Sequence, residues 1–338
     1  MEPTTLIIAV VIAALMFDFC NGWNDSANAI ATVVSTRVLS PLAAVALSAL
    51  LNFAGAFASE EVAKTIGGGL VDKDQVTQTI VLASMLSASV WVGCMTMVGM
   101  PISGSHSLIG ALVGAAAFAK GMAIVHVDGV TKVLVAMLIS PILGAFLGFG
   151  VMAIILWLFR HARPTLVHNL FGKLQLMSVG LMSWMHGTND AQKVMGVITL
   201  ALFAGNFLEA GPDGRVAVPL WVKIACATVM AMGTAAGGWK VIRTLGMGLI
   251  KIRPVHGFAA ETGASITLGL AAWQGIPVST THTITGSIIG VGMTQRASGV
   301  NYGLGKKIMY AWLLTLPCTA LLSGLFHALL VFMGLGHR

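Results

Sequence analysis

Long stretches without any charged residue are the feature that most limits what this chain can fold into. Asp, Glu, Lys and Arg are all absent from residues 38–59, 75–119, 133–159, 262–295 and 308–337. A helix needs about 20 apolar residues to cross a hydrocarbon core of roughly 30 Å, and each stretch is long enough for at least one crossing. Only 9% of the 338 residues are charged, whereas a soluble domain carries about 25%. We therefore predict an all-α polytopic membrane protein and exclude a water-soluble fold.

The remaining charges predict how the chain sits in a lipid bilayer. We expect roughly ten to twelve membrane segments, half-crossings included, in one integrated transmembrane domain. The net charge of +7 indicates cationic loops that meet anionic lipid and set the orientation, and it does not indicate a nucleic acid partner. The basic intervals 160–173 and 240–253 are expected on the cytoplasmic side. The polar interval 59–74, with its acidic residues and run of glycines, is predicted to be a solvated connector.

Two pairs of segments repeat within the chain. Residues 16–30 (MFDFCNGWNDSANAI) match residues 181–195 (LMSWMHGTNDAQKVM), with Gly-x-Asn-Asp in both copies. Residues 99–114 (GMPISGSHSLIGALVG) match residues 275–290 (GIPVSTTHTITGSIIG). The sequence therefore predicts two related halves, residues 1–159 and 160–338. Internal repeats with interrupted apolar segments at matching positions are typical of secondary transporters, which hold their substrate near the midplane.

The first repeated motif places acidic side chains at membrane depth. Asp18, Asn21, Asp25 and Asn28 follow at helical spacing and stack on one face. Carboxylates at this depth mark ion pathways or substrate sites, although a role in holding helices together explains Asp18 alone equally well. Their hard oxygens suit a small cation; sodium is favoured, and a proton on a carboxylate is the alternative. In the second copy, Lys193 can lie beside the carboxylate and favour its ionised form or replace a bound cation.

The second repeated motif predicts an anion site. Residues 262–295 would form a helix roughly 50 Å long, too long for one crossing, and Gly275-Ile276-Pro277 interrupts them. Each copy is therefore predicted to be two helices that meet at a Gly-x-Pro tip, with a new helix starting in residues 103–107 and 279–283. Free N–H groups and hydroxyls at a helix start bind oxyanions. Because the tips contain no Arg or Lys, we expect co-bound cations to compensate the charge, as in a cation-coupled oxyanion symporter.

These motifs resemble those of the PiT family of inorganic phosphate transporters. The resemblance rests on Asn21-Gly22-Trp23-Asn24-Asp25-Ser26-Ala27-Asn28-Ala29, its second copy at residues 187–195, and the two P-x-S-x-x-H segments. It covers essentially the whole chain. It implies two inverted repeats with re-entrant helical hairpins, a multi-pass protein of the plasma (cytoplasmic) membrane, and a homodimer. It also implies import of inorganic phosphate with sodium, or of a metal–phosphate complex with protons as in some bacterial members, without a covalent cofactor.

The resemblance assigns roles to the repeated residues. The phosphate cradle would comprise Ser103, Ser105, Ser107, Ser279, Thr280, Thr281 and Thr283, completed by Asn24 and Asn189. The coupling cation would be held by Asn24, Asp25, Asn28, Asn189 and Asp190. From the residues themselves, we add Asp18, Glu261, His106 and His282 as candidate proton or coupling residues. The second signature departs from the first, with Gln192 and Lys193 where the first has Ala27 and Asn28, so the two halves need not take equal parts.

Three other functions fit parts of the same pattern. A sulfate permease would share the architecture and differ in the anion. An intramembrane hydrolase would use Ser105 and His106, but neighbouring residues on a helix do not ordinarily point together as a nucleophile and its base. A passive anion channel would give flux without accumulation. We expect no enzymatic activity and therefore no catalytic residue.

Overall fold

The computed structural model describes residues 3–211, 216–295 and 297–335, and this part of the chain is helical almost throughout. The α-helices are α1 (Pro3–Ser35), α2 (Pro41–Gly55), α3 (Glu61–Gly68), α4 (Gln78–Val98), α5 (Gly104–Lys120), α6 (Val127–Leu158), α7 (Pro164–Ala204), α8 (Leu220–Ala236), α9 (Trp239–Gly248), α10 (Pro254–Trp273), α11 (Thr280–Met293) and α12 (Tyr302–Leu330). Three short helices, η1 (Met122–Ile124), η2 (Ala297–Gly299) and η3 (Val331–Leu335), complete the set. The prediction of an all-α protein is confirmed.

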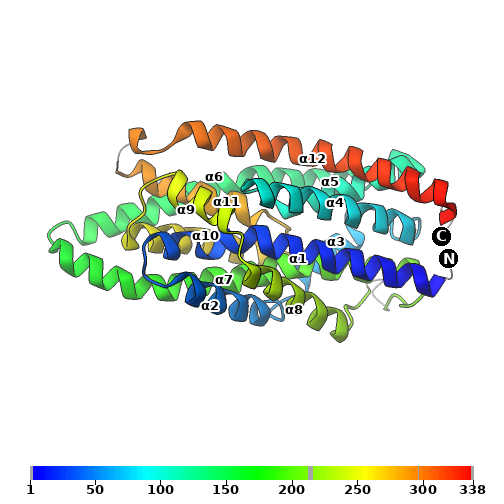
Figure 1. Cartoon of the computed structure of the whole chain (residues 1–338), viewed down its shortest axis with the longest axis horizontal. Coiled ribbons are helices and arrows are strands. Elements are labelled where there is room, and N and C mark those ends of the chain that lie inside the picture. The colour runs from blue at the N-terminus through cyan, green and yellow to red at the C-terminus, as the bar shows by residue number, and fades with distance from the viewer. Residues whose placement is uncertain (1–2, 212–215, 296, 336–338) are drawn as a thin grey trace.

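The longest helices run along the long axis of the molecule (Figure 1). Within the described residues, α1, α4, α6 and α12 are each long and apolar enough to cross a membrane, and α8 with α9 makes a fifth span across a 67° bend. Their outward side chains, such as Leu321 and Leu325 on α12, are large, apolar and exposed, as lipid requires. The polytopic membrane protein is thus confirmed, whereas the number of ten to twelve segments, which included half-crossings, stays a prediction.

Both Gly-x-Pro motifs break the chain where the sequence predicts. α4 ends before Gly99 and α10 ends shortly before Gly275, and these two glycines have φ angles of 78° and 64°, a region that side chains with a Cβ rarely adopt. α5 and α11 then begin after Ser103 and Ser279, whose hydroxyls cap the new helices. We call residues 99–107 the first tip and residues 275–283 the second tip.

The two hairpins enter the molecule from opposite ends. The α4–α5 hairpin starts at the end that holds both chain termini, where the Thr79 hydroxyl donates to the carbonyl oxygen of Leu335 at 2.6 Å. The α10–α11 hairpin starts at the other end, near the connection between α6 and α7 (Figure 1). Their tips meet in the interior, where the Thr281 hydroxyl donates to the Ile102 carbonyl oxygen at 2.9 Å.

Helices from the first half of the sequence pack against helices from the second half. α1 contacts α8, and α7 contacts α2; likewise α5 contacts α12, and α11 contacts α6. Glycines allow these close approaches: a Cβ at Gly22 would collide with the Met230 carbonyl oxygen of α8, and one at Gly187 with the backbone of Asn52 in α2. Residues 1–159 and 160–338 are therefore interleaved, and the boundary between them stays a prediction.

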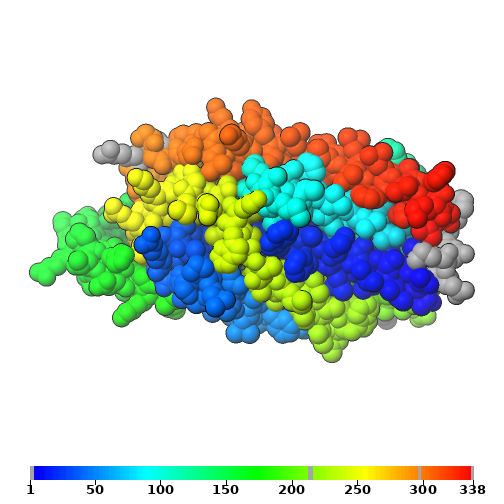
Figure 2. Space-filling model, viewed as in Figure 1, coloured from blue at the N-terminus to red at the C-terminus, as the bar shows by residue number. Residues whose placement is uncertain are grey.

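A polar layer separates two hydrophobic clusters. One cluster contains buried apolar residues of α1 up to Phe17 and of α7 from Ala191 onward. The other contains buried apolar residues of α1 from Ala27 onward and of α7 up to Met182. The parts of α1 and α7 between these limits hold the repeated Asn-Asp pairs. In the space-filling view, the bend between α8 and α9 (yellow-green) covers the middle of α1 on one face (Figure 2), where the Gly238 N–H donates to the Ser26 hydroxyl at 2.8 Å.

The polar interval 59–74 is not simply the solvated connector that its composition predicts. It forms α3, whose apolar residues Val62, Ala63 and Ile66 are buried. The side-chain oxygen of Gln192 on α7 accepts the N–H groups of Val62 (3.0 Å) and Ala63 (3.3 Å) at the start of this helix. The expectation of a wholly solvated connector is wrong because three apolar residues share one face of a short helix, a pattern that the surrounding acids and glycines conceal.

Candidate functional site

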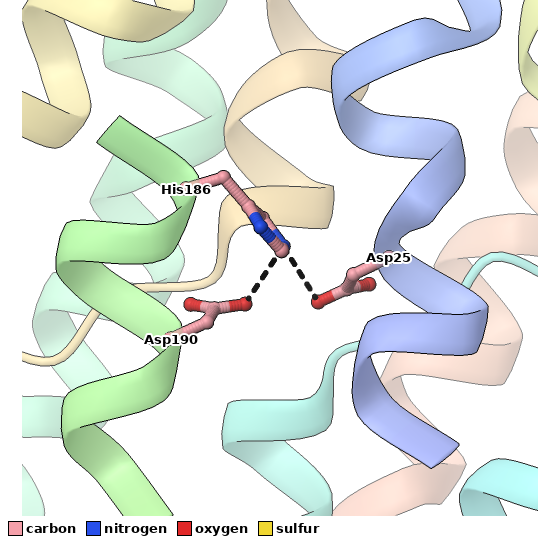
Figure 3. Close-up of side chains that lie close together, drawn as sticks. All are labelled: Asp25, His186 and Asp190. Carbon is pink, nitrogen blue, oxygen red and sulfur yellow. Dashed lines mark ion pairs between the residues drawn. The ribbon is translucent and has the colours of Figure 1, made fainter. Parts of the chain in front are cut away.

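Two carboxylates and an imidazole meet at the centre of the polar layer. The Nε2 atom of His186 lies 3.7 Å from Asp25 Oδ2 and 3.3 Å from Asp190 Oδ2, so the ring stands between α1 and α7 (Figure 3). All three side chains are buried, and each offers one ligand atom within 4.8 Å of the others. Oxygen and imidazole donors at this spacing can hold a small cation or share a proton.

The second tip docks on both carboxylates. The Thr281 hydroxyl oxygen lies 2.9 Å from Asp25 Oδ1, and that of Thr280 lies 3.0 Å from Asp190 Oδ2 and 3.3 Å from Asp25 Oδ2. Asn28 Nδ2 donates to the two threonine hydroxyls at 3.0 and 3.3 Å. The structure therefore brings together residues of both repeated motifs that the sequence assigns to the cradle and to the cation.

A buried lysine joins the site. Lys193 Nζ forms an ion pair with Asp190 Oδ1 and donates to the Ser105 hydroxyl at 2.5 Å and to the Val278 carbonyl oxygen at 2.9 Å. It is only 2% exposed. Lys193 thus lies beside the Asp190 carboxylate, as the helical spacing predicts. Because α7 also extends this side chain to Ser105 and Val278, a fixed positive charge adjoins both tips, although neither tip carries a cationic residue of its own.

The two tips hold each other through matching bonds. The Ser105 hydroxyl donates to the Val278 carbonyl oxygen at 2.9 Å, and the Thr281 hydroxyl donates to the Ile102 carbonyl oxygen at 2.9 Å. Aligning the repeats pairs Ser105 with Thr281 and Ile102 with Val278. One hydroxyl of each hairpin therefore donates a hydrogen bond to the backbone of the other hairpin's tip.

The other hydroxyls assigned to the cradle are bonded within their own helices. Ser103 and Ser279 accept the N–H groups of His106 and His282 at 3.1 and 3.2 Å. The hydroxyls at two further positions donate to carbonyl oxygens one turn earlier, Ser107 to Ser103 and Thr283 to Ser279. In this structure these four residues shape the helix starts, whereas Ser105, Thr280 and Thr281 contact the Asp25–His186–Asp190 cluster or its lysine.

The two signature asparagines brace the hairpins. Asn24 Nδ2 donates to the Thr96 hydroxyl at 2.9 Å and to the Met100 carbonyl oxygen at 3.2 Å. Asn189 Nδ2 donates to the Leu268 carbonyl oxygen of α10 at 3.3 Å and to the Met185 carbonyl oxygen of its own helix at 2.8 Å. Its buried Oδ1 has no hydrogen-bond partner among the described residues. Each asparagine thus fixes backbone near the cluster, and Asn189 keeps an oxygen for a ligand.

Asp18 and Glu261 lie on either side of the cluster along α1. Asp18 is fully buried, and its carboxylate oxygens have no hydrogen-bond partner within the described part of the chain. Glu261 accepts hydrogen bonds from Thr32, Ser178 and Gln175, the last at 3.0 Å. Asp18, Asp25 and Thr32 follow at seven-residue intervals, so these groups lie roughly 10 Å apart on one face of α1.

The two histidines of the tips lie next to each other beside the cradle. The ring centroids of His106 and His282 are 4.5 Å apart, and His282 stacks on Trp312 at 3.7 Å. Among the described residues, neither His106 Nδ1 nor His282 Nε2 has a hydrogen-bond partner. Trp312 donates its ring N–H to the Pro101 carbonyl oxygen at 3.0 Å; no sequence signal singles out this tryptophan.

Comparison with known proteins identifies the family. The sequence profile of the phosphate transporter family matches residues 21–168 and 160–323. The chain belongs to the phosphate transporter family. It is 43% identical to a Bacillus subtilis (strain 168) protein named "Probable low-affinity inorganic phosphate transporter", over 96% of this chain and 97% of that one. A protein of the same name from Rhizobium meliloti (strain 1021) is 44% identical, over 95% of each chain.

A solved structure shares the fold of this family member. The structure, titled "The sodium-dependent phosphate transporter", superimposes with a TM-score of 0.89 and covers 97% of this chain and 100% of its own, at 24% identity. At that identity the likeness establishes the fold. The resemblance to phosphate transporters that the sequence motifs indicate is thus confirmed for the family and for the helical membrane architecture.

Proposed function

We propose that this phosphate transporter imports inorganic phosphate by symport with a cation, and that phosphate binds where the two tips meet. The observation that carries the proposal is the convergence of two hydroxyl-bearing helix starts, α5 and α11, on the buried Asp25–His186–Asp190 cluster. Helix starts and hydroxyls donate hydrogen bonds to an oxyanion, and Lys193 adds a positive charge beside Ser105. The proposed cradle comprises the tip residues named above, completed by Asn24 and Asn189.

Electrostatics supports coupling to a cation at this site. Asp25 and Asp190 are buried and would repel a phosphate anion placed beside Thr280 and Thr281. A cation bound at the carboxylates removes this repulsion, and a buried charge without a partner is costly. Cation and phosphate therefore favour each other's binding, and the effect is reciprocal. Such a linkage is what allows a cation gradient to drive phosphate uptake.

Sodium is the favoured coupling ion, with a proton as the alternative. The buried oxygens of Asp25 and Asn28 suit sodium, and the structural neighbour is named for its sodium dependence. His186, placed between the two carboxylates, suits a proton. Asp18, Glu261, His106 and His282 remain candidates for relaying or coupling, and no covalent cofactor is required.

The proposed architecture is two inverted halves, residues 1–159 and 160–338, in a homodimer in the plasma membrane. The reciprocal packing of α1 on α8 and of α7 on α2 supports the duplication. We expect no enzymatic turnover: within the described residues, neither tip histidine is hydrogen-bonded to a tip hydroxyl through its ring, as a nucleophile and its base would require. A phosphoester hydrolysed by wild type but not by Ser105→Ala would contradict this view.

Labelled phosphate uptake into proteoliposomes tests the function. Sodium and proton gradients are imposed independently, and unlabelled sulfate is added as a competitor. Accumulation driven by one of the two gradients, and resistant to sulfate, is the expected result. Uptake that ignores both gradients would indicate a passive channel and overturn the symport. Uptake of labelled sulfate in place of phosphate would keep the architecture and identify a sulfate permease.

A further inference from the structure

The two copies of the Asn-Asp signature make the same contact with different chemistry. Asn28 and Lys193 occupy matching positions when the signatures are aligned, and so do Thr281 and Ser105 in the tips. Asn28 Nδ2 donates to the Thr281 hydroxyl at 3.0 Å, and Lys193 Nζ donates to the Ser105 hydroxyl at 2.5 Å. A neutral amide in the first half therefore has an ammonium group as its counterpart in the second.

The difference between Asn28 and Lys193 also changes which ligand atoms each half has available for a mobile cation. Asn28 is 1% exposed, and its Oδ1 atom has no hydrogen-bond partner within the described chain, so an oxygen ligand remains available close to Asp25. Lys193 has no acceptor atom. Its ammonium group already pairs with Asp190 Oδ1 and with the Val278 carbonyl oxygen, which are the oxygens that a cation in the second half would use.

We propose that Lys193 is a tethered cation that permanently fills the cation position of the second half, so that phosphate transport exchanges a cation only at the Asp25 side. A second mobile cation at Asp190 would lie beside the ammonium group in a buried site, where like charges repel strongly. The proposal rests on the proposed symport and specifies its coupling: one half carries its positive charge as a side chain, and the other takes it from solution.

The variant Lys193→Asn tests this inference by placing the residue of the first half in the second. Labelled phosphate binding is measured on the purified protein at fixed pH, in sodium-free buffer and in a sodium titration. Wild type is expected to need one cation fewer per phosphate than the variant. In sodium-free buffer the variant should bind phosphate about tenfold more weakly or worse, and added sodium should restore the affinity with a steeper dependence than in wild type.

Two further variants keep the test decisive. Lys223→Asn removes a lysine that pairs with Glu60 away from the tips, and it should keep the cation dependence of wild type. Asn28→Lys places a second tethered cation in the first half. It should bind phosphate without any added cation, and its uptake should no longer respond to the cation gradient. This reciprocal variant decides the matter if Lys193→Asn fails to fold, as judged by gel filtration.

The outcomes separate this inference from the proposed function. If Lys193→Asn folds and shows the same cation dependence as wild type, or loses phosphate binding that no cation restores, the tethered cation is wrong while the symport stands. If phosphate binding by Asn28→Lys depends on cations as it does in wild type, the tethered cation is likewise wrong while the symport stands. If wild type neither binds nor accumulates phosphate under any gradient, the proposed function itself fails.

Discussion

Single hydroxyl groups at the helix starts are expected to set the affinity for phosphate. Ser105 and Thr281 have hydroxyls that bond to the opposite tip and lie beside charged side chains. Replacing either by Ala removes one donor to a charged ligand, which is worth about 1.5–3 kcal/mol, or roughly 10- to 150-fold in affinity.

Equilibrium binding of labelled phosphate measures this loss. Ser84→Ala is the matched control, because the Ser84 hydroxyl is buried but donates to the Ile80 carbonyl oxygen of its own helix, and it should leave the affinity unchanged. Equal affinities in Ser105→Ala, Thr281→Ala and wild type would remove these residues from the phosphate site.

The two carboxylates of the cluster are expected to differ in their effect on stability. Asp190 pairs with Lys193, whereas Asp25 has no lysine among its contacts in the described residues. Asp190→Asn leaves the buried Lys193 ammonium group without its carboxylate partner. Removing one member of a buried ion pair lowers the free energy of unfolding by about 3–5 kcal/mol. Asp25→Asn should destabilise less and act mainly on cation coupling.

Thermal unfolding of the two variants in the same detergent separates these effects. Asp190→Asn should melt well below Asp25→Asn, and Asp25→Asn should show the weaker response of phosphate uptake to a cation gradient. An equal melting temperature for both would mean that the ammonium group finds another partner.

At the residue scale, the sequence predicts some members of the site and conceals others. Repetition singles out Asp25, Asp190 and the tip threonines, because the same polar types recur in the same order in two apolar segments. His186 and Lys193 are spaced four and three residues from Asp190, so a helix places all three on one face. That the lysine reaches Ser105 depends on where α7 crosses the first tip, and no spacing within one helix contains that information.

The hairpins depend on glycines at their turns. Gly99 has a φ angle of 78°, and a Cβ added there would lie 2.9 Å from Cβ of Lys240 on α9. Gly121, which follows α5, has a φ angle of 82° and a ψ angle of 176°, and an added Cβ there would meet nothing within 4 Å among the described residues. Gly121→Ala should therefore cost about 1–3 kcal/mol, because its backbone conformation is one that essentially only glycine adopts. Gly99→Ala should cost about 1–2 kcal/mol for its left-handed backbone, in addition to the cost of displacing Lys240.

Thermal unfolding in detergent compares these two variants with Gly150→Ala. Gly150 lies within α6 in open space, so alanine there should be neutral or should stabilise by up to about 1 kcal/mol. If Gly99→Ala melts together with Gly150→Ala, neither the left-handed backbone at Gly99 nor its close approach to Lys240 limits stability.

At the element scale, the predicted breaks and restarts are correct because Gly and Pro act locally. The partners of each hairpin are a property of the whole chain. Nothing within residues 99–114 indicates that α5 packs against α12, and nothing within residues 275–290 indicates that α11 packs against α6. The bend between α8 and α9 was likewise not predicted, because Gly237 and Gly238 interrupt an otherwise ordinary apolar segment.

The whole molecule carries its loop charges unevenly. At one end, the connections 36–40, 159–163 and 249–253 contain Arg and Lys but no Asp or Glu. At the opposite end, near both termini (Figure 1), the connection 69–77 contains one Lys, Lys73, between Asp72 and Asp74. An excess of Lys and Arg is retained on the cytoplasmic side, so the basic end should face the cytoplasm and both termini should face outward.

Cysteine labelling in intact cells tests this orientation. His161 and His126 are exposed residues in connections at the basic and the opposite end. With the native cysteines replaced, a membrane-impermeant maleimide should label His126→Cys in intact cells and label His161→Cys only after the membrane is opened. The reverse pattern would invert the topology. This charge pattern is readable from the sequence, whereas which connections share an end follows from the fold.

The meeting of the two tips in the interior also determines how the site senses the membrane potential. Each hairpin penetrates from its own end, so a charge travelling from either aqueous phase to the tips crosses about half of the electric field. Since one elementary charge moved through 100 mV is worth about 2.3 kcal/mol, each half-journey is worth roughly 1.2 kcal/mol. Loading on one side and release on the other should therefore share the voltage dependence of transport about equally.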